Sequence, residues 1–145
     1  WRRCSIKSIA LLPNVLARQE ATDTGCREAV LVRDGVVTEG TSRSILIVAG
    51  GELLTHPLDD TILGSITRQI VLDLAADAGI PCEEMRFGVD QMLEADEVIA
   101  VGTTTEVAAV TQVDGRKIAS GAAGPVTRRL HHAYREFIAS ECRIR

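Results

Sequence analysis

Lys7 is the first residue of the sequence whose type and surroundings suggest chemistry. It lies in "CSIKSIALLP", within a chain that has 2 lysines and 14 arginines, so Lys7 is not routine surface charge. We expect residues 2–8 to form a strand. A strand lysine in apolar surroundings has its charged form disfavoured, so its amine can act as the nucleophile of a Schiff base. The alternative is an edge-strand lysine that points to water.

Glu39 is the second such residue, in "VVTEGTSRSI", residues 36–45. We expect it at the end of a strand, just before Gly40 and a group of hydroxyl residues. A buried carboxylate beside hydroxyls can keep a cationic ring nitrogen protonated. An ordinary glutamate in a turn would give the same sequence, and both alternatives stay open on this evidence.

The stretch "TILGSITRQ" places Gly64 and Ser65 directly ahead of Ile66 and Thr67, at an expected helix start. Unpaired backbone N–H groups and a hydroxyl at a helix amino end form an anion site suited to a phosphate. A Ser or Thr that caps the helix is the alternative.

A similar pattern occurs in "VGTTTEV", residues 101–107, which follows the apolar strand "EVIAV". Gly102 and then Thr103 and Thr104 lie beyond the carboxyl end of that strand. A glycine followed by clustered hydroxyls is again typical of a phosphate-binding turn. A structural turn rich in threonine would look the same.

Together these stretches require one ligand with an aldehyde for the lysine, a ring nitrogen for the glutamate and a phosphate for the two turns, and pyridoxal phosphate has all three. The sequence resembles the large domain of the class IV (fold-type IV) pyridoxal-phosphate aminotransferases, most closely the D-amino acid transaminase group. The resemblance runs in order through "CSIKSIALLPNVLARQEA", "EAVLVRDGVVTEGTS", "LLTHP", "ILGSITR", "TTTEVAAVTQVDG" and "GPVTRRL".

By this resemblance, Lys7 is the catalytic residue that forms the Schiff base with the cofactor, and Glu39 pairs with its pyridine nitrogen. The remaining cofactor-binding residues are Leu63 under the ring and, at the phosphate, Ile66, Thr67, Thr103 and Thr104. The family-typical Ser-Asn pair after the glutamate motif is replaced by Arg43 and Ser44.

The resemblance further implies an aminotransferase that moves an amino group between a D-amino acid and a 2-oxo acid, and that works as a homodimer. It implies that residues 1–145 are the C-terminal domain and that a small N-terminal domain is absent, in line with a chain that begins at Trp1 and not at Met. Branched-chain aminotransferases and aminodeoxychorismate lyases are alternatives of the same fold. A non-catalytic α/β module that binds a phosphorylated small molecule is the alternative from another class.

The composition narrows the other possibilities. A chain of 145 residues with 46% hydrophobic residues is long enough for one domain with its own core. A net charge of −4 without a basic face argues against nucleic acid or an anionic membrane as partner. No apolar run is long enough to span a bilayer, so we expect a cytoplasmic protein. No metal or redox site is indicated, since the histidines and cysteines lack the spacing of metal ligands or of a redox pair. We expect the cysteines to be reduced and mostly in the core; they are Cys4, Cys26, Cys82 and Cys142.

The pattern of apolar residues predicts an α/β domain in which a mixed sheet forms a pseudo-barrel with surrounding helices. Two Asp-Gly turns, at 34–35 and 114–115, predict hairpins. Strands are expected at 2–8, 27–33, 44–49, 52–56, 82–87, 97–101 and 107–113. Helices are expected at 12–24, with one apolar face of Leu12, Val15, Leu16 and Gln19, at 64–78, with a stripe of Ile66, Ile70, Leu74 and Ala78, at 89–95, and from Pro125 onward.

Overall fold

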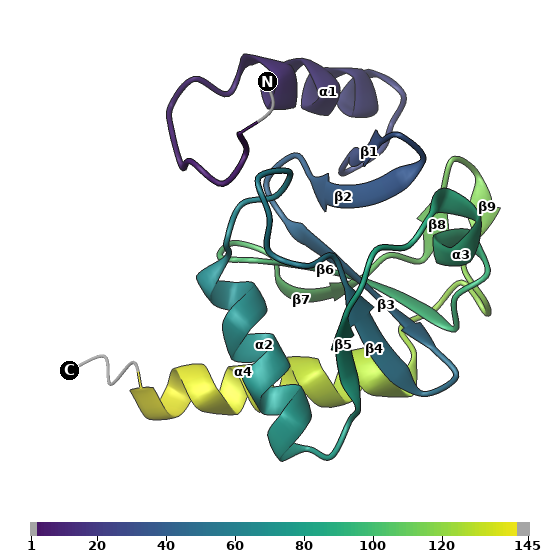
Figure 1. The fold of residues 1–145 in the computed structure, drawn as a ribbon. Helices are drawn as coiled ribbons and strands as arrows, with labels where there is room; N and C mark the ends of the chain where they lie inside the picture. Colours follow the sequence, from purple (N-terminus) through teal and green to yellow (C-terminus); the bar gives the residue numbers. More distant parts are fainter. Residues whose placement is uncertain (1–2, 142–145) are drawn as a thin grey trace.

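The computed structural model describes residues 3–141, which alternate between helices and strands (Figure 1). The helices are α1 (Leu12–Asp23), α2 (Ile66–Asp77), α3 (Val89–Leu93) and α4 (Pro125–Glu141). The strands are β1 (Val30–Arg33), β2 (Val36–Gly40), β3 (Ser44–Ala49), β4 (Glu52–Thr55), β5 (Cys82–Glu84), β6 (Glu97–Gly102), β7 (Glu106–Ala109), β8 (Gln112–Val113) and β9 (Arg116–Lys117).

A mixed sheet of five strands, in the order β5-β4-β3-β6-β7, forms the centre of the domain. The β4–β5 pair is parallel and the other pairs are antiparallel, which confirms the predicted mixed α/β sheet. Between residues 3 and 141 the remaining strands form two separate hairpins, β1–β2 and β8–β9. Both hairpins turn at the predicted Asp-Gly pairs, where Asp34 and Asp114 have φ of 50° and 45°.

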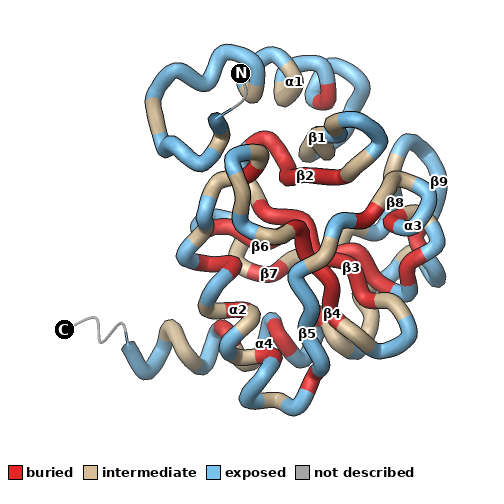
Figure 2. Tube along the Cα trace, viewed as in Figure 1, coloured by how far each residue is buried: buried red, intermediate tan, exposed pale blue. Residues whose placement is uncertain are grey.

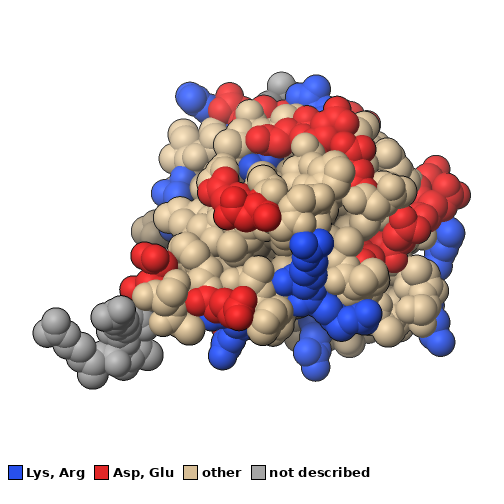
Figure 3. Space-filling view, turned by 90° about the horizontal axis from the view of Figure 1, so that it is seen from below, with Lys and Arg blue, Asp and Glu red and all other residues tan. Residues whose placement is uncertain are grey.

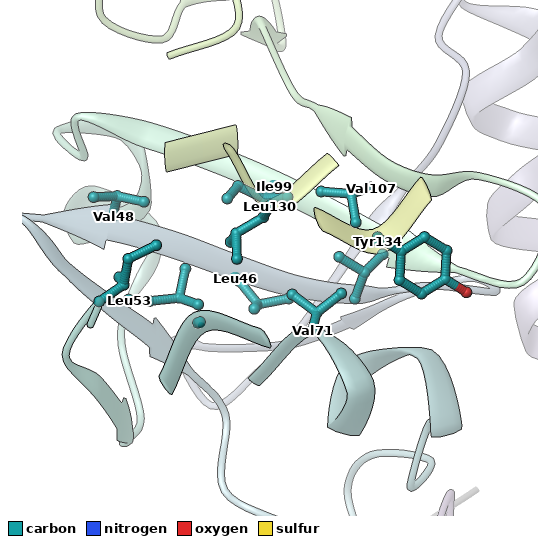
Figure 4. Packing of buried hydrophobic residues seen from close by; sticks show 11 residues of the cluster. Leu46, Val48, Leu53, Val71, Ile99, Val107, Leu130 and Tyr134 are labelled. Carbon is teal, nitrogen blue, oxygen red and sulfur yellow. The ribbon is translucent and has the colours of Figure 1, made fainter. Parts of the chain in front are cut away.

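The central strands alternate between two buried faces, as a strand with a repeat of two residues must. Leu46 of β3 and Ile99 of β6 pack on the face that α2 and α4 cover (Figure 4). Ile45 and Val98 point to the opposite face, which is covered by β2, α3 and the chain around Ile118. Figure 2 shows that burial concentrates in these strands and that α1 lies outside this core.

Helix α2 begins at the predicted place, because Ser65 Oγ accepts a hydrogen bond from the N–H of Arg68 at 3.2 Å. Its predicted apolar stripe is wrong at Ile66, whereas Ile70, Leu74 and Ala78 are partly buried against the core. Ile66 is 80% exposed, and the buried row is Thr67, Val71 and Ala75. The helix is rotated because Val71 and Ala75 fill the core against the sheet and Arg68 has buried partners of its own.

Arg68 is 1% exposed and joins α2 to the sheet. Its Nη2 donates to the carbonyl of His56 at 2.9 Å and to Glu84 Oε2 at 2.8 Å. His56 is also buried, and its Nδ1 lies 2.8 Å from the carbonyl of Pro57. Both side chains therefore have structural partners.

Helix α1 presents its predicted apolar face outward. Asn14, Ala17 and Ala21 lie on the side toward the domain, whereas Leu12, Val15 and Leu16 are 66%, 58% and 60% exposed. Since these three exposed residues lie within about one turn of the helix, they form an apolar surface that is uncovered among residues 3–141.

The segment before α1 is not a strand in the part that the structure describes. Residues 3–8 form turns and bends, and the predicted start at residue 2 lies outside the described residues. The N–H of Cys4 bonds to the carbonyl of Asp60 at 2.7 Å, and Ser5 Oγ donates to Asp60 Oδ1 at 2.7 Å. A strand needs a neighbouring strand edge, and this segment lies instead against the loop that precedes α2.

The cysteines are less buried than predicted. Cys26 and Cys82 are exposed and Cys4 is half-buried, while Cys142 lies outside the described residues. Within residues 3–141 no helix is long and apolar enough to cross a membrane. Acidic and basic side chains both occur on the face drawn in Figure 3, with uncharged surface between them.

Helix α4 begins against a buried carboxylate from the sheet. Glu97 of β6 is 6% exposed and accepts hydrogen bonds from the N–H groups of Val126 and Thr127, both at 2.8 Å, and from Thr127 Oγ1 at 2.6 Å. A carboxylate at a helix amino end satisfies N–H groups that have no partner within the helix. Gly124 makes this approach possible, because an added Cβ would overlap the Glu97 carboxylate.

We therefore expect Gly124→Ala to lower the free energy of unfolding by about 2 kcal/mol, as for other overpacked buried sites. Urea denaturation of the 145-residue chain measures the change. Gly64→Ala is the matched control, since a Cβ there meets open space, and it is expected to change stability by less than about 0.5 kcal/mol. Equal stability of the two variants would show that Glu97 can move away from Gly124 at little cost.

Candidate functional site

Glu39 lies in β2, where the sequence predicted a strand end, and it is 8% exposed. Its Oε2 accepts a hydrogen bond from the backbone N–H of Leu63 at 3.0 Å. Leu63 comes three residues before α2 and is half-buried. The structure thus brings Glu39 and Leu63 together across a long stretch of sequence.

Burial raises the pKa of the Glu39 carboxyl, and the Leu63 N–H and the charge of Arg33 oppose the rise by favouring the ionised form. A carboxylate of this kind gains from a cationic neighbour more than an exposed one does, because little water competes for it. Glu39 can therefore hold a proton on a ligand nitrogen placed against it.

Cys4 and Arg33 lie beside this carboxylate. Arg33 Nη2 donates to Cys4 Sγ at 3.2 Å. Burial raises the pKa of the Cys4 thiol, Arg33 lowers it, and the nearby Glu39 raises it further. The amino-terminal segment is therefore attached through Cys4 to Arg33 of β1 and to Asp60.

The amino end of α2 follows Leu63 directly. The Ser65 cap uses the N–H of Arg68, so the first N–H groups of the helix, at Ile66 and Thr67, remain available to a ligand. Thr67 is buried and Ile66 is exposed. Glu39 and the helix start are thus linked by one short loop, and an anion at these N–H groups would also meet the positive end of the helix dipole.

The threonine turn joins β6 to β7, as the sequence predicted, and Thr103 and Thr104 are exposed in it. Val101 and Val107, on either side of the turn, belong to the same core cluster as Val71 of α2. The two predicted phosphate turns therefore come from elements that pack together on one face of the sheet.

Arg43 links the Glu39 strand to this turn, and sequence reasoning did not find the link. Arg43 follows β2 after two residues, and its Nε donates to Thr105 Oγ1. Its Nη1 pairs with Glu28, which also accepts hydrogen bonds from the N–H and the hydroxyl of Thr41. The departure from the Ser-Asn pair was the one signal that could have drawn attention to Arg43.

Lys7 is exposed and lies in the turn-rich segment before α1, not on a strand in apolar surroundings. Cys4, three residues earlier, bonds to Arg33 and to Asp60. Because a chain spans at most about 3.5 Å per residue, Lys7 Cα lies within about 10 Å of the Cα of Cys4.

An open concavity of about 520 Å³ lies near this group of residues. It is lined by Arg33, Asp34, Val36, Thr38, His56, Thr61 and Arg86. The seven predicted site residues do not contribute to it, and its most buried polar side chains have structural partners. We therefore place the candidate site at Glu39 and the two turns, on donor chemistry and not on the size of a hollow.

Comparisons with known proteins agree with the geometry. Residues 1–113 match the family model of the amino-transferase class IV proteins. The chain is 45% identical over 141 residues to the D-alanine aminotransferase of Bacillus licheniformis, a match that covers 97% of this chain and 50% of that protein. The chain spans about half the length of the curated relatives it matches.

Solved structures give the same fold. The branched-chain aminotransferase of Thermoproteus uzoniensis with norvaline superposes with a TM-score of 0.90 at 34% identity, over 97% of this chain and 50% of that one. The branched-chain amino acid aminotransferase of Thermobaculum terrenum, solved in its PLP form, gives a TM-score of 0.90 at 33% identity over 95% of this chain and 46% of that one.

Proposed function

Because this chain belongs to the class IV aminotransferases, we propose that it is the cofactor-binding part of a pyridoxal-phosphate enzyme that moves an amino group between a D-amino acid and a 2-oxo acid. The identity to D-alanine aminotransferases supports the D-amino acid as substrate. Branched-chain aminotransferase activity is the second candidate, supported by the solved structures of similar fold.

The buried Glu39 carboxylate is the observation that carries the proposal. It bonds to the Leu63 N–H just ahead of the amino end of α2, so a partner for a ring nitrogen and an anchor for a phosphate lie in one loop. The donor set fits pyridoxal phosphate: Glu39 for the pyridine nitrogen, Leu63 under the ring, and Ile66, Thr67, Thr103 and Thr104 for the phosphate. A general phosphate-binding module would have no use for the buried carboxylate.

When bound, pyridoxal phosphate supplies an aldehyde that condenses with amines and a ring that withdraws electrons. Glu39 would keep the ring nitrogen protonated, since a desolvated carboxylate favours a cation beside it. The N–H groups at the start of α2 and the threonine hydroxyls would hold the phosphate and so orient the ring.

Lys7 would supply the amine for the cofactor aldehyde. Once free, its Nζ would act as the general base that takes the proton from the substrate Cα and then as the general acid that returns it. This role requires that the loop of residues 3–10 brings Lys7 to the Glu39 site in the whole enzyme.

We further propose that residues 1–145 form the C-terminal domain of the enzyme, that a smaller N-terminal domain completes the cleft, and that the enzyme is a homodimer. The half-length match to the relatives supports a second domain. The exposed apolar residues of α1 and of the segment before it support a surface that is covered in the whole enzyme, since Ile9 and Leu12 are 102% and 66% exposed.

The proposed function predicts that the 145-residue chain alone has no measurable transaminase activity and that the polypeptide extended upstream of Trp1 has it. Without the N-terminal domain that completes the cleft, water enters the site. The positioning of the substrate that makes amino-group transfer fast is then lost. The assay is D-alanine with 2-oxoglutarate, followed as pyruvate, for both forms of the protein.

The same assay with leucine and 2-oxoglutarate tests the second candidate. Faster turnover of leucine than of D-alanine would transfer the proposal to the branched-chain reaction. Turnover of D-alanine by the 145-residue chain alone would contradict the proposed division into domains.

A further inference from the structure

Among residues 3–141, Glu28 accepts four hydrogen bonds, one of them from Arg18, and it also forms an ion pair with Arg43. Arg18 of α1 lies 3.1 Å from Glu28 Oε2, and Arg43 pairs with the same oxygen. The other oxygen accepts from the N–H groups of Ala29 and Thr41, both at 3.1 Å. This group therefore joins α1 to the loop between β2 and β3.

The charges of Arg18, Glu28 and Arg43 do not cancel. Two guanidinium groups share one carboxylate, so the set of Arg18, Glu28 and Arg43 carries a net positive charge. Burial lowers the pKa of Arg43, and the charge of Arg18 lowers it further. The side chains of Glu28 and Arg43 are only 14% and 17% exposed, so water screens the remaining charge weakly.

The positive charge faces the threonine turn. Ser44 pairs with Val101, so the loop before β3 lies beside the end of β6. A Cβ added to Gly102 would lie 3.4 Å from Arg43 Cγ and 3.3 Å from the carbonyl oxygen of Ser42, which shows how closely the two segments pack. Arg43 is thus fixed against the base of the turn by packing as well as by its ion pair.

Arg43 also determines how Thr105 can use its hydroxyl. Arg43 Nε donates to Thr105 Oγ1, so a lone pair of that oxygen is occupied and its hydrogen points away from Arg43. Within residues 3–141 the structure provides no acceptor for this hydrogen. A hydroxyl that accepts from a cation is a stronger donor in turn, because hydrogen bonds in a chain polarise one another.

We propose that Arg43 is a positioning residue that makes Thr105 a hydrogen-bond donor to an anion, so that Thr105 joins Thr103 and Thr104 in an oxyanion site for the cofactor phosphate. This inference rests on the proposed function for the identity of the anion. The anion site itself rests on the charge of Arg18, Glu28 and Arg43 and on the position of Thr105 in the same turn as Thr103 and Thr104.

The test titrates the ¹⁵N-labelled 145-residue chain with inorganic phosphate and follows the amide resonances of residues 103–105. In the wild-type chain these resonances shift and saturate. Arg43→Ser weakens the apparent affinity about tenfold, the loss expected for one charge-assisted hydrogen bond. Arg43→Lys keeps the positive charge and a charged hydrogen-bond donor, and it stays within about threefold of the wild type.

Arg135→Ser is the matched control. Arg135 pairs with Glu106 at the other side of the same turn, at 2.8 Å, but it is 60% exposed. Its removal leaves the affinity for phosphate unchanged. If Arg43→Ser does not fold, Thr105→Val replaces it and is expected to lose affinity to a similar degree.

Absence of a saturable shift in the wild-type chain, or equal affinity in Arg43→Ser or Thr105→Val, overturns the inference. Titrations with pyridoxamine phosphate and with pyridoxamine then identify the source of the anion. If Arg43→Ser loses affinity for pyridoxamine phosphate but not for pyridoxamine, the site binds the cofactor phosphate. An unchanged affinity for pyridoxamine phosphate with weaker binding of 2-oxoglutarate overturns that assignment in favour of a substrate carboxylate. A third result separates the two proposals. If the chain binds phosphate in a way that depends on Arg43 but binds neither pyridoxamine compound, the anion site stands and the proposed function is wrong.

Discussion

Lys7→Ala is expected to reduce transamination by about 10³-fold or more in the polypeptide extended upstream of Trp1, because the variant lacks both the amine that bonds the cofactor and the group that moves the Cα proton. The fold is expected to be unaffected, since Lys7 is exposed in a loop. Initial rates with D-alanine and 2-oxoglutarate measure the first effect, and thermal unfolding measures the second.

Lys117 provides the control, since it is the other lysine of the chain and is exposed in β9. Borohydride reduction in the presence of pyridoxal phosphate should fix the label on Lys7 and remove the visible absorption band, while Lys117→Ala keeps the band, the label and the activity. More than a few per cent of wild-type turnover in Lys7→Ala, or a label recovered mainly on Lys117, would refute the assignment of Lys7.

Glu39→Gln is expected to slow the chemical step on the order of 10²-fold and to change cofactor affinity far less, because an amide does not stabilise a protonated ring nitrogen as a buried carboxylate does. Single-turnover rates and cofactor titration separate the two effects. Glu83→Gln, at an exposed position of β5, is the control for the charge change and should leave both values unchanged.

The stability of Glu39→Gln should move in the opposite direction to its activity. Burial raises the pKa of Glu39 in the folded chain above its ordinary value of 4.5, so the folded state holds this proton more tightly than the unfolded state. The free energy of unfolding therefore falls as the pH rises from about 4 through the raised pKa, and remains lower above it. The variant Glu39→Gln has no carboxyl group at this position, so its free energy of unfolding does not fall for this reason as the pH rises.

Urea unfolding of the wild type and Glu39→Gln between pH 4 and about 7 tests the sign, because the difference between them should grow with pH in favour of the variant. A variant that became relatively less stable over this range would mean that Glu39 is stabilised in its charged form. A large loss of cofactor affinity with an unchanged single-turnover rate would contradict its role at the ring nitrogen.

The sequence allowed accurate prediction wherever local chemistry decides the structure. Strand β3 was predicted with its observed bounds, because its apolar run lies between the hydroxyl residues of the preceding loop and the Gly50-Gly51 turn. The Asp34-Gly35 hairpin was predicted because both residues adopt positive φ at little cost. Glu39 could be placed on a strand for the same reason, since that hairpin fixes where β2 begins.

Features that depend on distant partners could not be predicted. The burial of Arg68 requires Thr55, His56 and Glu84, none of which is near it in sequence. Residues 3–8 have strand-like composition but meet the loop at Asp60 instead of a strand edge. Arg43 was noticed only as a departure from a motif, because its pairing with Glu28 and Thr105 depends on how the sheet brings β3 beside β6.

The central position of β3 determines the order in which the chain can fold. Its first partner, β4, follows after a tight turn, but its second partner, β6, comes much later, with Ile47 paired to Val98. Contacts between residues so far apart close slowly, because the intervening chain loses entropy before they form. During synthesis the ribosome therefore releases the Glu39 strand and the β3–β4 hairpin well before residues 97–102. Until then the nascent chain carries an unpaired edge of the apolar strand β3, and such an edge favours pairing with other chains.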